Sequence, residues 1–149
     1  MSLGENYSEL TTRLGRIHTI YTVADLLVWD EQVNLPADGA DLRAGQLAAM
    51  AELQNAETAN ARLGELIGLL EADAASLDDA QRAVLRQARK DHDRAARLPP
   101  EFVRDKAEHN SRAYHAWADA RPKSDFTHFA PFLEKHLSLA RREAEYLGW

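Results

Sequence analysis

The sequence contains no cysteine, and this absence excludes several classes of protein at once. Without cysteine the chain has no disulfide framework, no thiolate zinc or iron–sulfur site and no cysteine nucleophile. Cysteine-free chains are typical of reducing compartments, so we expect a cytoplasmic protein.

Long apolar runs are also missing. The longest one, residues 19–29, is interrupted by Asp25 and is much shorter than the roughly 20 residues of a membrane-spanning helix. The N-terminus lacks the basic start and apolar core of a secretory signal. We therefore expect no membrane partner.

An excess of basic residues is the third absence. The net charge is −6, whereas neutralising nucleic-acid phosphates requires a basic excess, so we expect no nucleic-acid partner. The charge is uneven: residues 1–80 carry four basic and 14 acidic side chains, and residues 81–149 carry 14 basic and 10 acidic ones. This asymmetry predicts two halves that face each other within one fold.

What the chain does contain is helical periodicity. Its 149 residues and 45% hydrophobic content suit one globular domain, residues 1–149. Apolar residues recur at steps of three and four, and no segment alternates with period two. Short polar breaks favour antiparallel neighbours. The sequence therefore predicts an all-α protein, an up-and-down bundle of five to six helices.

Capping signals and breakers place the helix ends. Asn6 with Glu9 and Ser76 with Asp79 have the spacing of helix N-terminal caps, and Asp125 is a third candidate cap. Breaks are expected at residues 35–39, 99–100 and 121–124. The first predicted helix has its cap near Asn6 and its apolar stripe over residues 10–28. The other predicted helices cover residues 41–57, 62–72, 77–98, 100–121 and 126–147.

Six histidines are the first candidates for a metal site: His18, His92, His109, His115, His128 and His136. No two have the four-residue spacing that places a pair of imidazoles on one helix face, as in HExxH. Asp105 with His109, and His115 with Asp119, have the spacing of weak surface pairs. We predict no metal-binding residue.

Catalytic signatures are equally sparse. His128 and His136 flank Phe129, Phe132 and Leu133, which predicts partly buried histidines with hydrogen-bond partners rather than catalytic ones. The sequence brings no Ser-His-Asp set together. The seven glycines form no phosphate-binding loop. We therefore predict no catalytic and no cofactor-binding residue.

A basic stripe occupies one sector of the predicted fourth helix: Arg82, Arg86, Arg89, Lys90, Arg94 and Arg97. One interpretation is an anion-binding surface, but no aromatic residues interleave the stripe as a nucleic-acid platform requires. The favoured interpretation is a charged face that the chain's own carboxylates neutralise.

Three polar residues lie at positions where a polar or acidic side chain is unfavourable. Asp91 and Asn110 fall in line with apolar residues, so we expect both to be buried and hydrogen-bonded. Asp30 follows Trp29 at a helix C-terminus, where the helix dipole disfavours an acid. We predict that Asp30 either caps another helix or pairs with an arginine such as Arg43, and that Trp29 is a packing anchor.

The order of short strings along the chain resembles the carboxypeptidase Taq family of zinc metallocarboxypeptidases. The strings are Trp29-Asp30, Leu35-Pro36, Gly39-Ala40, Arg43-Ala44, Gln46-Leu47, Leu63-Gly64, Leu85-Arg86, Arg89, Asp91, Leu98-Pro99, Trp117, Ser124-Asp125-Phe126, Phe129, Pro131 and Leu133-Glu134-Lys135. The resemblance runs from about Leu10 to Leu147.

The resemblance implies a fold and an activity. Members of the family are longer all-helical homodimers that release C-terminal residues from peptides with a zinc or cobalt ion. Their metal ligands are an HExxH helix and a later glutamate, and this sequence ends at Trp149 without that motif. The resemblance therefore implies a non-catalytic, metal-free N-terminal cap region over the substrate cleft. The alternative is a free-standing helical interaction or oligomerisation module.

Overall fold

The computed structural model describes residues 2–149 and is entirely helical apart from turns. The helices are α1 (Leu3–Val33), α2 (Ala40–Thr58), α3 (Ala61–Ala72), α4 (Asp79–Arg97), α5 (Pro100–Lys123) and α6 (Phe126–Leu147), with short 3₁₀ turns η1 (Ala37–Gly39) and η2 (Ala74–Ser76). No strand occurs within residues 2–149, which confirms the prediction of an all-α helical bundle.

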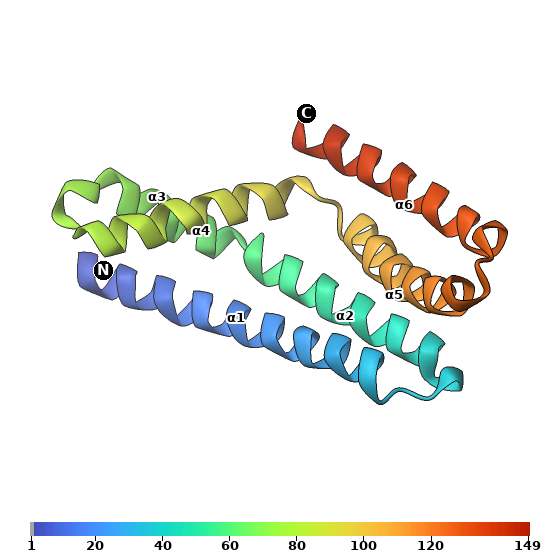
Figure 1. Cartoon of the computed structure of the whole chain (residues 1–149). Coiled ribbons are helices and arrows are strands. Elements are labelled where there is room, and N and C mark those ends of the chain that lie inside the picture. The colour runs from blue at the N-terminus through green and yellow to red at the C-terminus, as the bar shows by residue number, and fades with distance from the viewer. Residues whose placement is uncertain (1) are drawn as a thin grey trace.

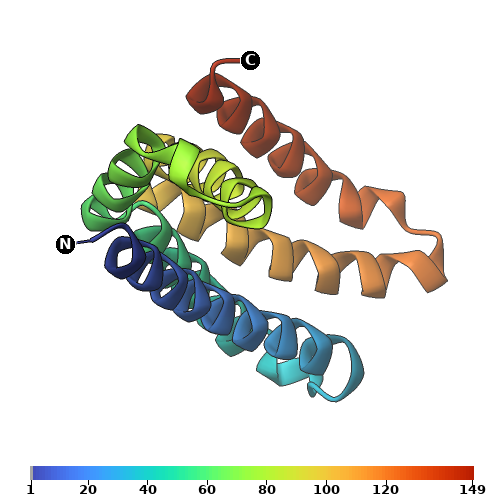
Figure 2. The same cartoon turned by 90° about the vertical axis from the view of Figure 1, so that its left-hand side faces the viewer.

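The helices form two groups along the long helix α1 (Figures 1 and 2). Helix α2 returns antiparallel to α1, and the α3–α4 pair packs beside the N-terminal part of α1. The α5–α6 pair lies on the other side of α2, which contacts both α1 and α5. Helix α2 is therefore the central element of the second group.

Two of the predicted caps are wrong, and in both cases another residue with the same chemistry takes the position. Helix α1 begins four residues earlier than Asn6 suggests, because Ser2 and Glu5 form the capping box. Helix α4 is capped by Asp78 with Gln81 instead of Ser76 with Asp79. A sequence with several Ser, Asp and Asn residues near a helix start offers more than one register.

The other boundaries agree with the breakers. Asp125 accepts a hydrogen bond from the backbone N–H of His128 and caps α6. Pro100 is the first residue of α5, where a missing N–H costs nothing. Ser124 ends α5 with a φ of 53°, a left-handed conformation that favours glycine or asparagine.

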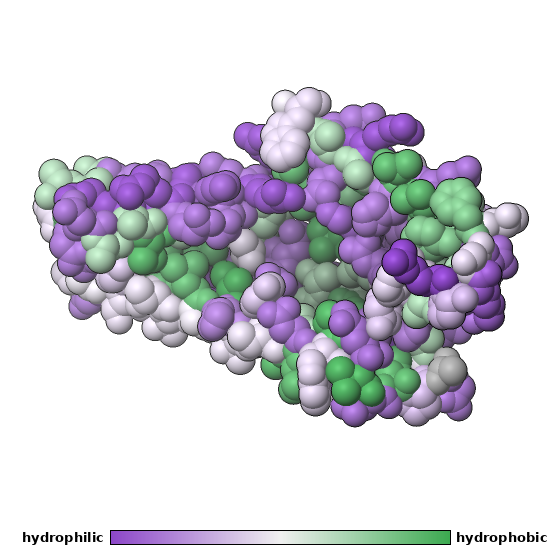
Figure 3. Space-filling view, in the orientation of Figure 1, coloured by the Kyte–Doolittle hydropathy of each residue, from purple (hydrophilic) through white to green (hydrophobic). Residues whose placement is uncertain are grey.

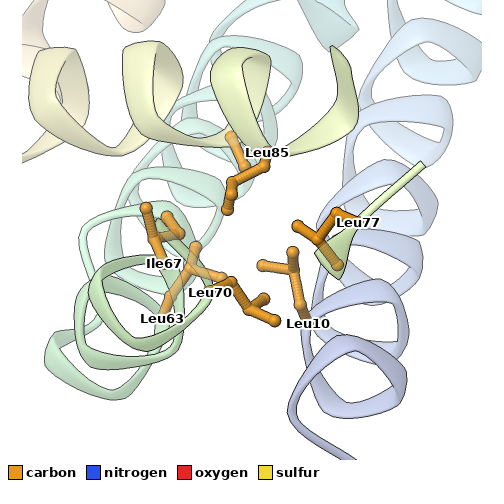
Figure 4. Packing of buried hydrophobic residues seen from close by; sticks show 7 residues of the cluster. Leu10, Leu63, Ile67, Leu70, Leu77 and Leu85 are labelled. Carbon is orange, nitrogen blue, oxygen red and sulfur yellow. The ribbon is translucent and has the colours of Figure 1, made fainter. Parts of the chain in front are cut away.

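The apolar core lies where α1, α3 and α4 meet (Figure 4). Its buried members are Leu10, Leu63, Ile67, Leu70, Leu77, Leu85 and Ala88. Full burial of a leucine or isoleucine side chain contributes about 1.5–3 kcal/mol, so this cluster is the main stabilising unit of its group. Helices α2 and α5 instead bury small residues at several positions, among them Ala44, Ala48, Ala116 and Ala120.

The acidic first half and the basic second half face each other, as predicted. Arg89 on α4 binds Glu71 at the end of α3, with Nη2 and Oε2 2.7 Å apart. Arg104 on α5 binds Glu52 on α2 at 3.3 Å, and Arg112 approaches Asp41 at 3.4 Å. None of the helices described is both long enough and apolar enough to cross a bilayer.

Candidate functional site

A groove runs over α2 between α1 and α5, and it consists of two recesses of about 390 and 290 Å³. The recesses share the lining residues Ala51, Gln54, Ala107 and Asn110, so they are continuous. Figure 3 shows a hollow in this part of the surface, with apolar residues at its base. The small side chains of α2 and α5 leave this space open.

One end of the groove contains a buried carboxylate. The Glu31 side chain, from the last turn of α1, is only 4% exposed. On α5, the Ser111 hydroxyl donates a hydrogen bond to Glu31 Oε1, and His115 Nε2 lies 3.1 Å from the same oxygen. Because residues four apart share one helix face, both partners reach Glu31 from a single helix.

This cluster does not have the order of a catalytic triad. In a triad the histidine lies between the nucleophile and the acid, and it accepts the proton of the hydroxyl. Here Glu31 lies between Ser111 and His115, so the hydroxyl hydrogen bond goes to the carboxylate. The arrangement can position α5 against α1 and bind a group in the groove, but it does not activate Ser111 as a nucleophile.

The other end of the groove carries a charge network. Glu143 of α6 binds Arg94 of α4 at 2.7 Å and also binds Lys106 of α5. Burial raises the pKa of Glu143, but the two cations outweigh that effect, and its pKa lies below the ordinary value. Asp91 also lines this end, which therefore carries as many negative as positive side chains.

Side-chain amides line the middle of the groove. Gln54 and Asn110 belong to both recesses, and Asn55 and Gln32 belong to one each. An amide offers both donors and acceptors, so such a surface matches the N–H and C=O groups of an extended peptide. The groove thus combines peptide-like polarity with a buried negative group at one end.

Asp91 and Asn110 occupy positions that correct the sequence prediction. Both are exposed instead of buried, since they face the groove and no helix covers them. Asp91 accepts hydrogen bonds from Gln87 at 2.9 and 3.0 Å. Their alignment with apolar residues is a signal of the groove wall, and not of a packed core.

The histidines also differ from their predicted environments. His109 is buried, and its Nε2–H donates to the carbonyl oxygen of Phe132 at 3.1 Å, while Asp105 binds Lys135. Burial lowers the pKa of His109 below its ordinary value. The prediction of a surface pair between Asp105 and His109 is therefore wrong, because α6 packs over this face of α5.

His115 binds Glu31, and its predicted partner Asp119 instead binds Lys123 and lies 3.8 Å from His128. His128 and His136 are both exposed, so the prediction that they are partly buried is wrong. Phe132 lies four residues from each of them on the same face of α6. Its ring stacks on His109 of α5, and the His136 ring lies 6.1 Å from the same histidine, so both histidines lie at the exposed edge of the contact with α5.

His92 is the histidine with the least usual environment. Both ring nitrogens are buried without a hydrogen-bond partner in residues 2–149, although Nδ1 lies 3.5 Å from Asp93 Oδ1. The ring lies against Gly64 on α3, where a β-carbon added to the glycine would be 2.8 Å from Nε2. His18 is exposed and stacks beside Tyr21.

The basic stripe on α4 is largely neutralised within the chain. Arg82 binds Asp79 and the carbonyl of Leu77, Arg89 binds Glu71 and Asp93, and Arg94 binds Glu143. Arg97 donates to the carbonyl of Leu147. Arg86 and Lys90 have no ion-pair partner in the described part of the chain. The favoured interpretation of the stripe, neutralisation by carboxylates of the same chain, is confirmed for three of its six members: Arg82, Arg89 and Arg94.

Of the two predicted roles of Asp30, the structure shows the ion pair: Asp30 binds Arg43 at 2.5 Å, and this contact lowers the pKa of Asp30. Arg43 also donates to the carbonyl of Leu27 and thereby ties α2 to the end of α1. Trp29, however, is 55% exposed, so the prediction of a packing anchor is wrong. Nothing in residues 2–149 covers its ring.

Comparison with known proteins identifies the family of the chain. A sequence model of the carboxypeptidase Taq (M32) metallopeptidases matches residues 9–149. The chain belongs to the M32 family. Thermostable carboxypeptidase 1 of Pyrococcus furiosus is 33% identical over 147 residues, or 97% of this chain and 29% of the relative. Thermostable carboxypeptidase 1 of Thermus thermophilus is 31% identical over 82% of this chain and 24% of its own length.

The structure of the chain is also similar to solved structures of M32 carboxypeptidases. The crystal structure of BsuCP superimposes with a TM-score of 0.93 at 25% identity, covering 97% of this chain and 29% of BsuCP. The chain thus spans less than a third of the length of these M32 relatives. The similarity includes α1, α2 and α5, which form the groove.

A divalent metal of the kind that M32 enzymes carry does not fit the residues described. Within residues 2–149 no three His, Asp, Glu or Cys side chains come together in a metal-binding arrangement. Glu31 and Glu143 are the carboxylates buried deepest at the groove, and each already has two protein partners.

Proposed function

We propose that this chain is the N-terminal helical cap of a metal-dependent carboxypeptidase, and that its groove forms part of the wall along which a peptide substrate passes. In this role the chain takes no part in bond cleavage. Its membership of the M32 family supports the carboxypeptidase assignment. The positions of Ser111, Glu31 and His115 support a binding role instead of a nucleophilic one.

The observation that carries the proposal is the amide-lined groove. Along α2 its lining extends from Leu47 to Thr58, a rise of about 16 Å at 1.5 Å per residue. An extended peptide covers that length with about five residues. The groove is therefore the right length and polarity for a short segment of unfolded chain.

A chimera tests this function. Residues 3–149 would replace the matching segment of the Pyrococcus furiosus relative, and the relative without any such segment would be the control. We expect the chimera to release C-terminal residues from peptides in a metal-dependent manner and the control to lose that activity. A folded but inactive chimera would contradict the proposal.

The isolated chain supplies the complementary test. Purified residues 1–149, assayed with added zinc or cobalt, are expected to release no C-terminal residue. Metal-dependent release by this chain would show that it is catalytic by itself and would contradict the non-catalytic role.

A second candidate function is a free-standing interaction module, and exposed apolar side chains near the end of α1 provide the means to distinguish it from the cap. Leu26 and Val33 are more than half exposed, as is Leu42 at the start of α2. A cap separated from its enzyme should self-associate through such a surface, so we propose that the chain forms homo-oligomers. A stable monomer in light scattering would instead favour the module.

A further inference from the structure

We propose that the recess at the Glu31 end of the groove is a binding pocket for a basic peptide side chain, lysine or arginine, whose cationic group lies against Glu31 Oε2. The inference rests on the proposed function, since it names the class of side chain that the groove would select. It concerns recognition of the peptide and assigns no step of the reaction.

The first argument is that one oxygen of the largely buried Glu31 carboxylate is accessible from the recess. Both hydrogen bonds of Glu31 use Oε1, and Oε2 has no partner in residues 2–149. Glu31 is nevertheless one of the residues that line the recess. Oε2 is not among the buried unpaired atoms of the described residues, so it is open to the recess that Glu31 lines. A cation beside this oxygen would stabilise a carboxylate whose remainder is removed from water.

The second argument is that the cations of the neighbouring helices are engaged elsewhere. Arg43 binds Asp30 and the carbonyl of Leu27. Arg112 binds Glu108 at 2.9 Å and approaches Asp41. His115 approaches Glu31 on the Oε1 side and does not line the recess, which leaves Glu31 as the one charged residue of its described lining.

The third argument is the shape of the recess. Its walls are largely aliphatic: Ala24, Val28, Leu47, Ala51 and Ala107. The volume of about 290 Å³ is at the lower limit of small-molecule sites and suits one long side chain. Aliphatic walls with one carboxylate match the methylene stem and charged tip of lysine or arginine.

The polar lining completes the match. Tyr114 offers an aromatic ring, to which ammonium and guanidinium groups are attracted. Gln32, Gln54 and Asn110 offer amide oxygens that accept further hydrogen bonds from the cation. An acidic side chain would instead meet the Glu31 charge, and a purely apolar one would leave Oε2 uncompensated.

The test measures binding of capped pentapeptides to residues 1–149 by calorimetry. One peptide carries a central lysine, a second carries arginine, and the control carries norleucine, which keeps the aliphatic stem and lacks the charge. We expect the basic peptides to bind about tenfold more tightly than the norleucine peptide, or better. Equal affinities would overturn the proposal.

Two variants locate the effect. Glu31→Gln keeps a hydrogen-bonding group near Ser111 and should reduce the preference for lysine to about twofold or less. Ala24→Leu fills the recess without touching Glu31 and should weaken binding of both basic peptides. Asp25→Asn removes an exposed carboxylate on the same helix and serves as the matched control, with affinities unchanged. Circular dichroism verifies folding of each variant.

Two further results distinguish this pocket from other binding sites. If the preference for lysine is unchanged in both Glu31→Gln and Ala24→Leu, the cation binds elsewhere and the inference is overturned. Butylammonium carries the same cationic tip without a peptide; we expect it to compete with the lysine peptide at much higher concentration, and competition at equal concentration would show a pocket for free amines. If the chimera is active but the chain shows no preference for lysine, only this inference is refuted. If the chain prefers lysine but the chimera is inactive, only the proposed function is refuted.

Discussion

The two helix groups are stabilised in different ways. Where α3 and α4 pack on the first half of α1, the buried residues are leucines and isoleucines. In the group around α2 and α5, alanines and the polar side chains of Glu31, Arg43 and Ser111 are buried beside larger apolar ones such as Phe102 and Leu47. The first group therefore relies on an almost wholly apolar core, whereas the second adds specific hydrogen bonds among buried polar groups and leaves a groove open.

The comparison teaches that one helix can serve two purposes along its length. Leu10 of α1 is fully buried in the core, whereas Glu31 of the same helix lines a recess. Each group should therefore respond to its own kind of substitution, and the following predictions run from the largest expected effect to the smallest.

Truncation in the apolar core should have the largest effect. Ile67 is completely buried, and Ile67→Ala should lower the free energy of unfolding by about 2–5 kcal/mol, because it leaves a cavity. Urea denaturation followed by circular dichroism measures this loss. The exposed Leu69→Ala is the control on the same helix, and an equal loss there would contradict the assigned core.

Contact between α3 and α4 depends on Gly64. A β-carbon at this position would meet the His92 ring at 2.8 Å, so Gly64→Ala should cost about 1–3 kcal/mol. Combining it with His92→Ala should cost less than the sum of the two single changes, since the clash is then absent. Strict additivity in a double-mutant cycle would show that the two residues do not press on each other.

In the second group, the matching change is Glu31→Ala. It leaves the Ser111 hydroxyl without its acceptor and should cost about 1–3 kcal/mol. Glu31→Gln should cost less, because an acceptor oxygen remains. If thermal unfolding shows both variants equal to the natural chain, the buried carboxylate contributes nothing to the packing of α1 on α5.

Acid should weaken the link between α1 and α3. Arg62 with Arg13 lowers the pKa of Glu9 to about 2 from an ordinary 4.5. A carboxyl with a lowered pKa stabilises the fold above its unfolded pKa, and this contribution declines as the pH falls from about 4.5 towards 2. Glu9→Gln should remove this part of the pH dependence, as urea midpoints across that range would reveal.

The smallest effect is expected on the exposed face of α4. Arg86 is exposed and has no ion-pair partner in the described chain, so Arg86→Gln should change stability by about 0.5 kcal/mol or less. Arg94→Gln should cost more, because Glu143 then loses one of its two cations. A reversed order in denaturation midpoints would contradict the ion-pair assignment.

Periodicity and breakers predict the helices well because both are local properties. The Pro99–Pro100 break and the Asp125 cap depend on neighbours a few residues away, and both are correct. Asn6 and Ser76 are not the caps, since Ser2 and Asp78 compete for the same role nearby. The pairing of Asp30 with Arg43 is predictable because a helix C-terminus disfavours an acid.

The groove could not be predicted in the same way. Glu31 and Ser111 are 80 residues apart, and only tertiary packing brings them together. Ser111 and His115 do share a helix face, which is a local signal, but nothing local identifies their partner on α1. Asp91 and Asn110 show the same limit, because a periodic pattern identifies a face without saying whether another helix covers it.

The two consecutive prolines between α4 and α5 have a mechanical consequence. Pro99 and Pro100 form one of the short connections between the two helix groups, and both have φ angles fixed by their rings. The adjacent Leu98 lines the groove, so this connection lies at the edge of the opening. The two rings reduce the number of orientations that α5 can take relative to α4, and part of the ordering of the groove is therefore present in the chain before any ligand binds.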